Sequence, residues 1–358
     1  MKYSLKITAL FAAASMVLPI IPANACTSLL LPTANDSHVY GRTMEFGFDL
    51  ESQAGFVPRG LEVTAQGPKG LAGKSWTTKY AVIGVNALEM AMVVDGMNEK
   101  GLAGGILYFP GYAEYTDVKD AVDGEALAPW EFLSWALTNF ATVEEVKEAI
   151  SEIQVVGVVL PALKMVPPFH YTLHDANGNS IVIEPTGGKL VVYDNPYGVM
   201  TNGPDFPWHV TNFQTYVKMT PLNAPPLKVA GQTITNLGQG SGWLGLPGDS
   251  TPPSRLIRAL AYSMTTNPKP SGIESVRLVE HIMNNFDIPY GFIQDKSGEH
   301  FDYTQWTTIA DIGTGSYYIK TYDNPNLMEI SFSDFDLDAD APVTKKIETD
   351  LTAPKLFE

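Results

Sequence analysis

The chain contains a single cysteine, Cys26, directly after a segment with the layout of a secretory signal peptide. Residues 1–25 begin with a short part that carries two lysines, continue with an apolar run from Ile7 to Ile21, and end in Ala23-Asn24-Ala25, a small-residue cleavage site. We therefore expect residues 1–25 to be removed and the mature protein to be periplasmic or extracellular. A sole cysteine cannot form an intramolecular disulfide, so Cys26 requires another explanation.

The remaining chain, residues 26–358, is long enough to bury a large core. It shows no repeat, flexible linker or long run of like charges, so we expect one domain over this range. The net charge is −16, or about −18 without the two leader lysines, which disfavours nucleic acid and anionic membranes as partners. No later segment approaches the roughly 18 consecutive apolar residues of a spanning helix, so we expect a soluble mature protein.

Short β-rich segments bounded by Gly, Asn, Asp or Pro predict antiparallel strands. They are Tyr80–Val85, Met92–Asp95, Tyr171–His174, Ser180–Pro185, Lys189–Asp194, Tyr317–Tyr322 and Met328–Ser333. Helical periodicity over Val146–Ile150 follows a capping box at Thr142–Glu145 and recurs at Pro253–Met264 and Ile273–Asn284. Sets of strands separated by helices predict an α+β fold in which helices pack on antiparallel sheets.

Aspartates alternate with other residues over 334–340, which raises the question of a calcium loop. The sixth position of such a loop would be Ala339 instead of Gly, and the twelfth would be Lys345 instead of Glu. Alternation of the aspartates with Phe335 and Leu337 instead predicts a half-exposed edge strand.

The histidines give no metal-binding motif, and no Gly-x-Ser-x-Gly or His-Glu-x-x-His pattern is found. His170 and His174 lie four residues apart, but in a predicted strand that spacing does not direct two side chains to one metal, so we interpret them as ordinary strand residues. We expect neither a metal nor a cofactor. A cysteine–histidine pair stays open, because any of the six histidines can approach Cys26 in space.

Cleavage before Cys26 would place a thiol and a free α-amine on one residue. An α-amine has an ordinary pKa near 8, so it can take the thiol proton and later protonate a leaving amine. The competing interpretation is a lipoprotein, whose lipid-modified cysteine also follows a leader. Such leaders usually carry Leu three residues before the cysteine, where this chain has Ala23. The local sequence therefore favours a nucleophile.

Several short blocks follow one another from Cys26 onward. They are Cys26–Ser28, Gly41–Phe46, Thr77–Val82, Asp95–Leu102, Thr201–Pro204, Trp208–Val210, Leu246–Asp249, Ser254-Arg255 and Thr304–Thr307. In this order they resemble the choloylglycine hydrolase family, which includes conjugated bile-acid hydrolases and penicillin V acylases. The resemblance covers nearly the whole mature chain. It implies an N-terminal-nucleophile hydrolase fold, an αββα sandwich with two antiparallel sheets between helical layers, and a homotetramer.

The resemblance also implies roles for four residues. Cys26 supplies the thiol and the α-amine, and Arg42 lies beside the thiol and favours the thiolate. Asn202 supplies a side-chain N–H to the oxyanion hole, and Arg255 supports the site by charge pairing. Without the family, Arg42 would be interpreted as a surface strand residue, Asn202 as a turn residue and Arg255 as an exposed helix residue.

Two further positions bear on activity and specificity. Glu45 stands where the family has an Asp that holds the α-amine, and its extra methylene displaces the carboxylate. Tyr108 stands where the bile-acid hydrolases tend to carry Asn and the penicillin acylases Tyr. Its backbone N–H would complete the oxyanion hole, and its ring would border the acyl pocket.

These residues predict a hydrolase of linear, non-peptide amides that resembles penicillin V acylase, with N-acyl homoserine lactones as further candidate substrates. The alternative is a conjugated bile-acid hydrolase. A second alternative is a non-catalytic exported binding protein or lipoprotein that keeps the fold.

Overall fold

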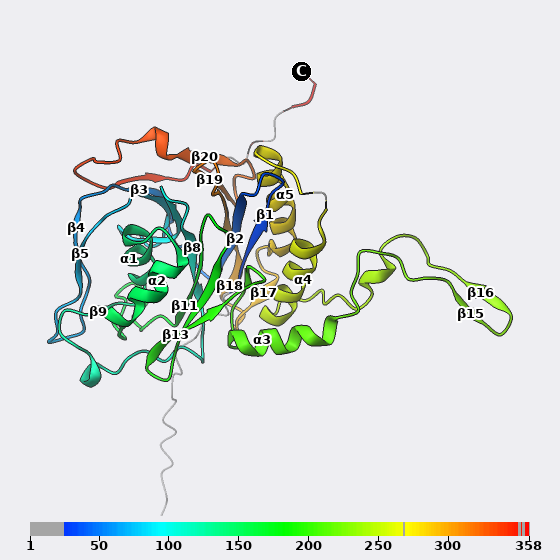
Figure 1. The fold of residues 1–358 in the computed structure, drawn as a ribbon, viewed down its shortest axis with the longest axis horizontal. Coiled ribbons are helices and arrows are strands. Elements are labelled where there is room, and N and C mark those ends of the chain that lie inside the picture. The colour runs from blue at the N-terminus through cyan, green and yellow to red at the C-terminus, as the bar shows by residue number, and fades with distance from the viewer. Residues whose placement is uncertain (1–24, 268, 350–351, 353–354, 358) are drawn as a thin grey trace, which may run out of the picture.

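The structure, a computed structural model, describes residues 25–267, 269–349, 352 and 355–357. The expected signal peptide lies outside these residues except for Ala25. Two antiparallel sheets face each other at the centre of the molecule, and helices cover their outer faces (Figure 1). Among the described residues, no helix is long and apolar enough to cross a membrane.

The first sheet has seven strands in the order β14-β1-β2-β18-β19-β20, with β17 also paired to β18. Helices α4 (Pro252–Thr265) and α5 (Ile273–Met283) pack on its outer face against β1, β2 and β18. The strands are β1 (Cys26–Pro32), β2 (His38–Phe46), β14 (Val199–Met200), β17 (Ile293–Gln294), β18 (Phe301–Asp311), β19 (Ser316–Thr321) and β20 (Met328–Ser331).

The second sheet has eight strands in the order β13-β12-β11-β8-β7-β6-β3-β21. Helix α1 (Phe132–Asn139) packs on β7 and β8, with α2 (Val143–Ala149) beside it (Figure 1). The strands are β3 (Gln53–Val57), β6 (Val82–Asn86), β7 (Val93–Asn98), β8 (Ala103–Tyr108), β11 (Phe169–His174), β12 (Ser180–Thr186), β13 (Lys189–Asp194) and β21 (Val343–Lys346).

Smaller elements connect these layers. Helix α3 (Phe206–Phe213) follows β14. The two-stranded pairs are β4 (Glu62–Thr64) with β5 (Ser75–Thr77), β9 (Ala126–Leu127) with β10 (Gln154–Val155), and β15 (Leu227–Val229) with β16 (Gln232–Ile234). Single 3₁₀ turns lie at Val118–Asp120, Ile150–Glu152, Gln214–Tyr216, Ser241–Trp243, Asn284–Phe286 and Phe332–Asp334.

The predicted strands and helices are confirmed, with ends that differ by up to three residues. They correspond to β6, β7, β11, β12, β13, β19 and β20, and to α2, α4 and α5. The Thr142 side chain accepts from the Glu145 N–H, whereas the Glu145 carboxylate accepts from Ala141 N–H instead of closing the box on Thr142. The central strands β1, β2 and β18 give no alternating pattern, because both of their faces are buried.

The edge strand predicted over residues 334–340 is wrong. Strand β20 ends at Ser331, and the chain then crosses from the first sheet to β21 at the edge of the second. The Phe335 ring stacks on Phe56 with ring centroids 4.3 Å apart, and Leu337 packs against the same core. These apolar side chains anchor a crossing segment, so their alternation with aspartates does not mark a strand.

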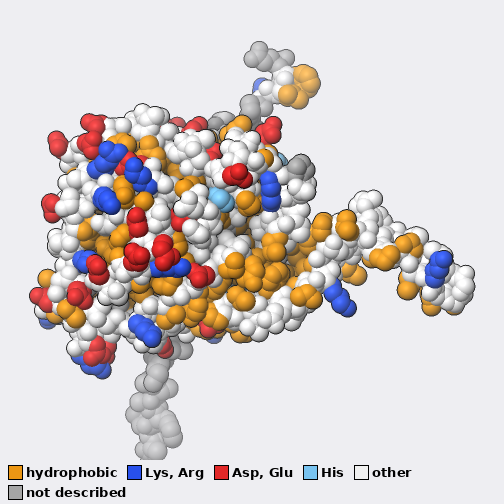
Figure 2. Space-filling view, in the orientation of Figure 1, with side chains coloured by type: hydrophobic (Ala, Val, Ile, Leu, Met, Phe, Trp, Pro, Cys, Tyr) orange, Lys and Arg blue, Asp and Glu red, His pale blue; other side chains and the backbone are white. Residues whose placement is uncertain are grey.

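A hairpin arm, residues 217–245, projects away from the sandwich and ends in β15 and β16 (Figure 1). Apolar side chains are exposed along this arm (Figure 2). Together they form a large apolar surface on a segment that has no core of its own. They include Val217, Leu222, Leu227, Ile234, Leu237 and Leu244.

Candidate active site

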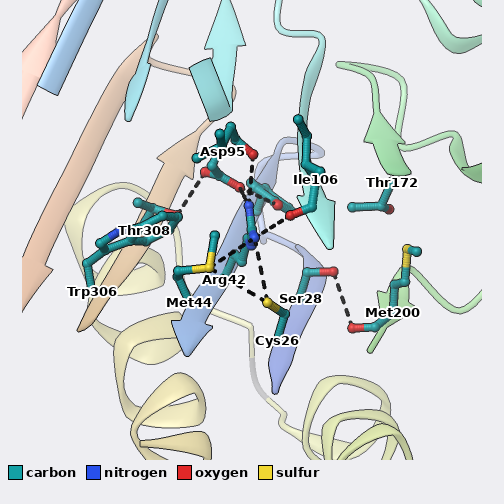
Figure 3. Close-up of polar contacts among 12 residues, drawn as sticks. Cys26, Ser28, Arg42, Met44, Asp95, Ile106, Thr172, Met200, Trp306 and Thr308 are labelled. Carbon is teal, nitrogen blue, oxygen red and sulfur yellow. Dashed lines mark hydrogen bonds and ion pairs between the residues drawn. The ribbon is translucent and has the colours of Figure 1, made fainter. Parts of the chain in front are cut away.

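Cys26 is the first residue of β1 and is only 1% exposed. In the antiparallel register Cys26 lies opposite Met44 and Ser28 lies opposite Arg42, so these side chains share the face of the first sheet that looks toward the second. Arg42 Nη2 approaches Cys26 Sγ at 3.7 Å (Figure 3). The sequence interpretation of Arg42 as a surface residue therefore fails, and the family-based placement beside the thiol holds.

Arg42 is completely buried and held on several sides. Its guanidinium donates to the carbonyl oxygens of Val94, at 2.9 Å, and Ile106, and it lies over the Trp306 ring at 5.2 Å. It also forms an ion pair with Asp95 at 3.4 Å. Burial alone would lower the pKa of Arg42, but the adjacent Cys26 and Asp95 reverse that effect and raise it. A fixed positive charge therefore stands beside the thiol.

Asp95 is the buried counter-charge of Arg42, and the sequence reasoning missed it. Its Oδ2 accepts from the Tyr40 hydroxyl at 2.7 Å, and its Oδ1 accepts from Thr308 at 2.8 Å and from Tyr317 (Figure 3 shows Asp95 with Arg42 and Thr308). Asp95 opens one of the family-like blocks and Arg42 lies in another. These two residues carry opposite charges, and neither had an assigned partner. That was the signal for the ion pair in the sequence.

Gly105 on β8 leaves room for this charged cluster. A Cβ atom at this position would lie 2.6 Å from Asp95 Oδ2 and 2.8 Å from both Arg42 Nη1 and the Tyr40 hydroxyl. Those distances are shorter than real Cβ contacts, so a side chain at this position would force the buried Asp95, Arg42 or Tyr40 side chain to shift.

Asn202 and Arg255 hold the backbone of Cys26. The peptide N–H of Cys26 donates to Asn202 Oδ1 at 2.9 Å, and Arg255 Nη2 donates to the same oxygen at 2.7 Å. Arg255 Nη1 donates to the Cys26 carbonyl and, at 2.8 Å, to Thr27 Oγ1. Asn202 Nδ2 donates to the Tyr108 carbonyl at 2.7 Å and has a second hydrogen for another acceptor. Burial lowers the pKa of Arg255 to about 10.

Glu45 is placed differently from the other predicted site residues. It follows Met44 on β2 and so projects from the opposite face of the sheet to the thiol. Glu45 Oε1 accepts from Thr304 at 2.9 Å, and its buried Oε2 has no hydrogen-bond partner among the described residues. Burial raises the pKa of Glu45 to about 7, although the charge of Arg255 opposes the shift. Its predicted contact with the α-amine stays a prediction.

An apolar inner pocket adjoins the thiol and has a volume of about 40 Å³. Its walls include Cys26, Met44, Phe46, Tyr108, Trp130 and Phe169. An outer pocket of about 210 Å³ shares Phe46, Tyr108 and Leu163 with it and opens beside Met165 and His300. The Tyr108 ring packs edge-on against Phe46 and Phe169, with centroids 6.1 and 5.9 Å away. The ring thus borders both pockets.

Within the part of the chain that the structure describes, the thiol contacts Arg42 and the Met44 sulfur, and no hydrogen bond joins it to a histidine. His170 and His174 are buried in β11. No group of three or more His, Cys, Asp or Glu side chains that could hold a metal is found in the same residues.

Two facing antiparallel sheets between helical layers, with a buried cysteine at the start of a central strand, define an N-terminal-nucleophile hydrolase fold. A family model described as linear amide C–N hydrolases, choloylglycine hydrolase family, matches residues 26–345. The chain belongs to this family and is an amidohydrolase of linear amides. The match begins at Cys26.

Comparison with individual proteins agrees with this assignment. The chain is 38% identical to the bile salt hydrolase/transferase of Clostridium perfringens over 91% of its length and 98% of the relative's. It is 27% identical to the penicillin V acylase of Pectobacterium atrosepticum, over 85% and 80% of the two chains. A crystal structure of a variant of the C. perfringens conjugated bile acid hydrolase matches with a TM-score of 0.82 and 35% identity, over 92% of this chain and 100% of that one.

Proposed function

We propose that the protein hydrolyses the amide bond of conjugated bile acids, with Cys26 as the nucleophile. The observation that carries the proposal is the thiol at the end of an apolar path formed by the inner and outer pockets. Such a path suits an apolar acyl group whose amide joins it to a polar amine. The similarity to the C. perfringens bile salt hydrolase/transferase at 38% identity supports bile acids over penicillin V, which the sequence reasoning placed first.

The proposed reaction is acyl transfer to water. Cys26 Sγ attacks the amide carbonyl and passes its proton to the α-amine of the same residue, so that an S–C bond forms and the carbonyl oxygen becomes an oxyanion. The free hydrogen of Asn202 Nδ2 and the backbone N–H of Tyr108 stabilise this charge. The C–N bond then breaks as the α-ammonium protonates the leaving amine, and water hydrolyses the thioester to release the acid and restore the thiol.

Penicillin V is the second candidate, and two observations favour it. The inner pocket is small, and the Tyr108 ring offers an aromatic wall on which a phenoxy group can pack. A steroid needs the segment that carries Leu163 and Met165 to move outward from the outer pocket. N-acyl homoserine lactones share the same apolar acyl requirement.

The test is hydrolysis by the purified mature protein of glycocholate, taurocholate, penicillin V and an N-acyl homoserine lactone at equal concentrations, with products identified by mass spectrometry. We expect the highest kcat/KM for a bile-acid conjugate. Faster turnover of penicillin V assigns the enzyme to the second candidate. No turnover of any of the four amides would count against all of these substrates and would direct the search to other linear amides.

The proposed mechanism requires that a signal peptidase cleave between Ala25 and Cys26, because only then does the Cys26 nitrogen become an amine. The start of the family match at Cys26 supports this. Intact mass of protein recovered from the periplasm or medium is expected to show an unmodified N-terminal cysteine. A retained leader would keep the Cys26 nitrogen in a peptide bond, and a diacylglyceryl adduct would block the thiol, so either result would exclude the mechanism.

We also propose that the protein assembles as a homotetramer, as the family resemblance implies. The hairpin arm supports this, because its exposed apolar side chains need cover that its own chain does not give them (Figure 2). Light scattering is expected to give the mass of four chains. Deletion of β15 and β16 together with their connecting turn is expected to reduce that mass, and an unchanged mass would place the contacts elsewhere.

A further inference from the structure

The backbone that carries Asn202 is held by two buried histidines. Residues 201–205 link β14 to α3, and two consecutive carbonyl oxygens of this link accept hydrogen bonds. His170 Nε2 lies 3.1 Å from the Thr201 carbonyl, and His209 Nε2 lies 2.9 Å from the Asn202 carbonyl. Because a carbonyl oxygen only accepts, both Nε2 atoms carry a hydrogen, which fixes the tautomer of each ring when neutral.

The two histidines come from different layers of the fold. His170 belongs to β11 of the second sheet, and its ring stacks on Phe109 with centroids 4.2 Å apart and planes 10° from parallel. His209 lies on α3, which follows the link directly. Both side chains are at least 97% buried. The link is therefore fixed from the sheet on one side and from the helix on the other.

Glu184 on β12 joins these two supports. Its carboxylate oxygens accept from the N–H of Phe206, the first residue of α3, at 3.0 and 3.2 Å. Its Oε1 also lies 3.4 Å from His170 Nδ1. One buried carboxyl group thus contacts both the sheet histidine and the start of the helix that carries His209.

We propose that His170, His209 and Glu184 are positioning residues that set the place of the Asn202 carboxamide against the Cys26 nitrogen and the reacting carbonyl. The inference rests on the proposed function of Asn202 as an oxyanion donor. None of the three touches the thiol, so they act through the backbone of residues 201 and 202. An error of about 1 Å in a catalytic group costs roughly 100-fold in rate, and this is the error that the three residues prevent.

The electrostatics of the three groups fit a structural role. Burial lowers the pKa of His209 to about 4 and that of His170 to about 3, so both rings stay neutral at ordinary pH. Burial also raises the pKa of Glu184 to about 8. A protonated Glu184 can donate to His170 Nδ1, which completes a chain from the carboxyl group to the Thr201 carbonyl.

The test compares His209→Gln with His209→Leu in the mature protein. Glutamine carries an N–H at the position of Nε2 and is expected to keep kcat within about fivefold of the wild type. Leucine removes the donor and is expected to lower kcat by about 10- to 100-fold while KM changes less than threefold, since Asn202 acts on the transition state. Val210→Ala, on the same helix, controls for loosened packing of α3, because the Val210 side chain packs against the core and cannot donate a hydrogen bond to the link. Thermal unfolding verifies that each variant folds.

Three results would overturn the inference. They are an equal kcat in His209→Leu and the wild type, equal losses of kcat in the Gln and Leu variants, and a change confined to KM. A crystal structure of His209→Leu tests the positioning role independently of the proposed function. Displacement of the Asn202 carboxamide in that variant, with no displacement in His209→Gln, supports positioning even if none of the tested amides is hydrolysed. An undisturbed Asn202 overturns the inference whatever the activity. Absence of hydrolysis by the wild type, in contrast, counts against the proposed function alone.

Discussion

Replacing Asp95 by Asn removes the carboxylate charge that faces Arg42 in the completely buried cluster between the sheets. The substitution also removes hydrogen bonds. Each carboxylate oxygen accepts from two donors, Tyr40 and Arg42 on one oxygen and Thr308 and Tyr317 on the other. Whichever oxygen becomes the amide nitrogen of Asn, two buried donors lose their acceptor.

Breaking a buried ion pair by removing one partner costs about 3–5 kcal/mol, against a typical total stability of about 5–15 kcal/mol. For a chain of this length the loss corresponds to a fall in Tm of about 4–7 °C. Calorimetry or urea unfolding of wild type and Asp95→Asn measures it. Asp194→Asn is the matched control. Asp194 forms an ion pair with Lys147, but its side chain is 78% exposed, so this substitution is expected to change the unfolding free energy by less than about 1 kcal/mol. A loss below 1 kcal/mol in Asp95→Asn would refute the reasoning.

Three further outcomes are expected. Cys26→Ala abolishes hydrolysis without unfolding the protein, Cys26→Ser keeps little activity, and iodoacetamide labels the sole thiol of the wild type and inactivates it; full activity of the alanine variant would exclude Cys26 as the nucleophile. The unfolding free energy of the wild type falls relative to Glu45→Gln between pH 4.5 and about 7, because the folded carboxyl, with its pKa raised by burial, holds a proton that the unfolded chain releases near 4.5. This stabilisation is complete below pH 4.5 and lost as the pH rises through 7, so parallel stability curves would contradict the burial argument. Tyr108→Asn raises the ratio of kcat/KM for glycocholate to that for penicillin V by about two- to tenfold by removing the aromatic wall, and an unchanged ratio would assign specificity to other parts of the pocket.

The sequence predicted several strands of the second sheet, including its inner strands β6, β7 and β11, but not the centre of the first sheet. Segments such as β12 and β13 end at turn residues that mark them clearly, whereas the buried residues of β1, β2 and β18 carry no alternation. The α+β class and its layered arrangement could be predicted, because helical periodicity separates the sets of strands. The pairing of strands distant in sequence could not.

The same limit applies to the site. The resemblance to a family supplied Cys26, Arg42, Asn202, Arg255 and Tyr108, and the structure brings these residues together. It supplied no partner for Arg42, since Asp95 lies 53 residues away and reaches it only when the sheets face each other. It also assigned Glu45 to the α-amine of Cys26. The alternation of β2 turns the Glu45 side chain to the face opposite the thiol, and its contact with the α-amine stays a prediction.

The site is divided between central strands and the segments that connect strands, and this division has a consequence for evolution. The nucleophile and its guanidinium lie on paired central strands, whereas Leu88, Met90, Leu160 and Leu163 of the inner pocket lie on segments between strands. Connecting segments tolerate substitution and changes of length far better than a buried ladder does. A lineage can therefore exchange one acyl group for another by altering these segments while its bond-cleaving residues stay unchanged, so substrate preference can diverge between relatives that share one reaction.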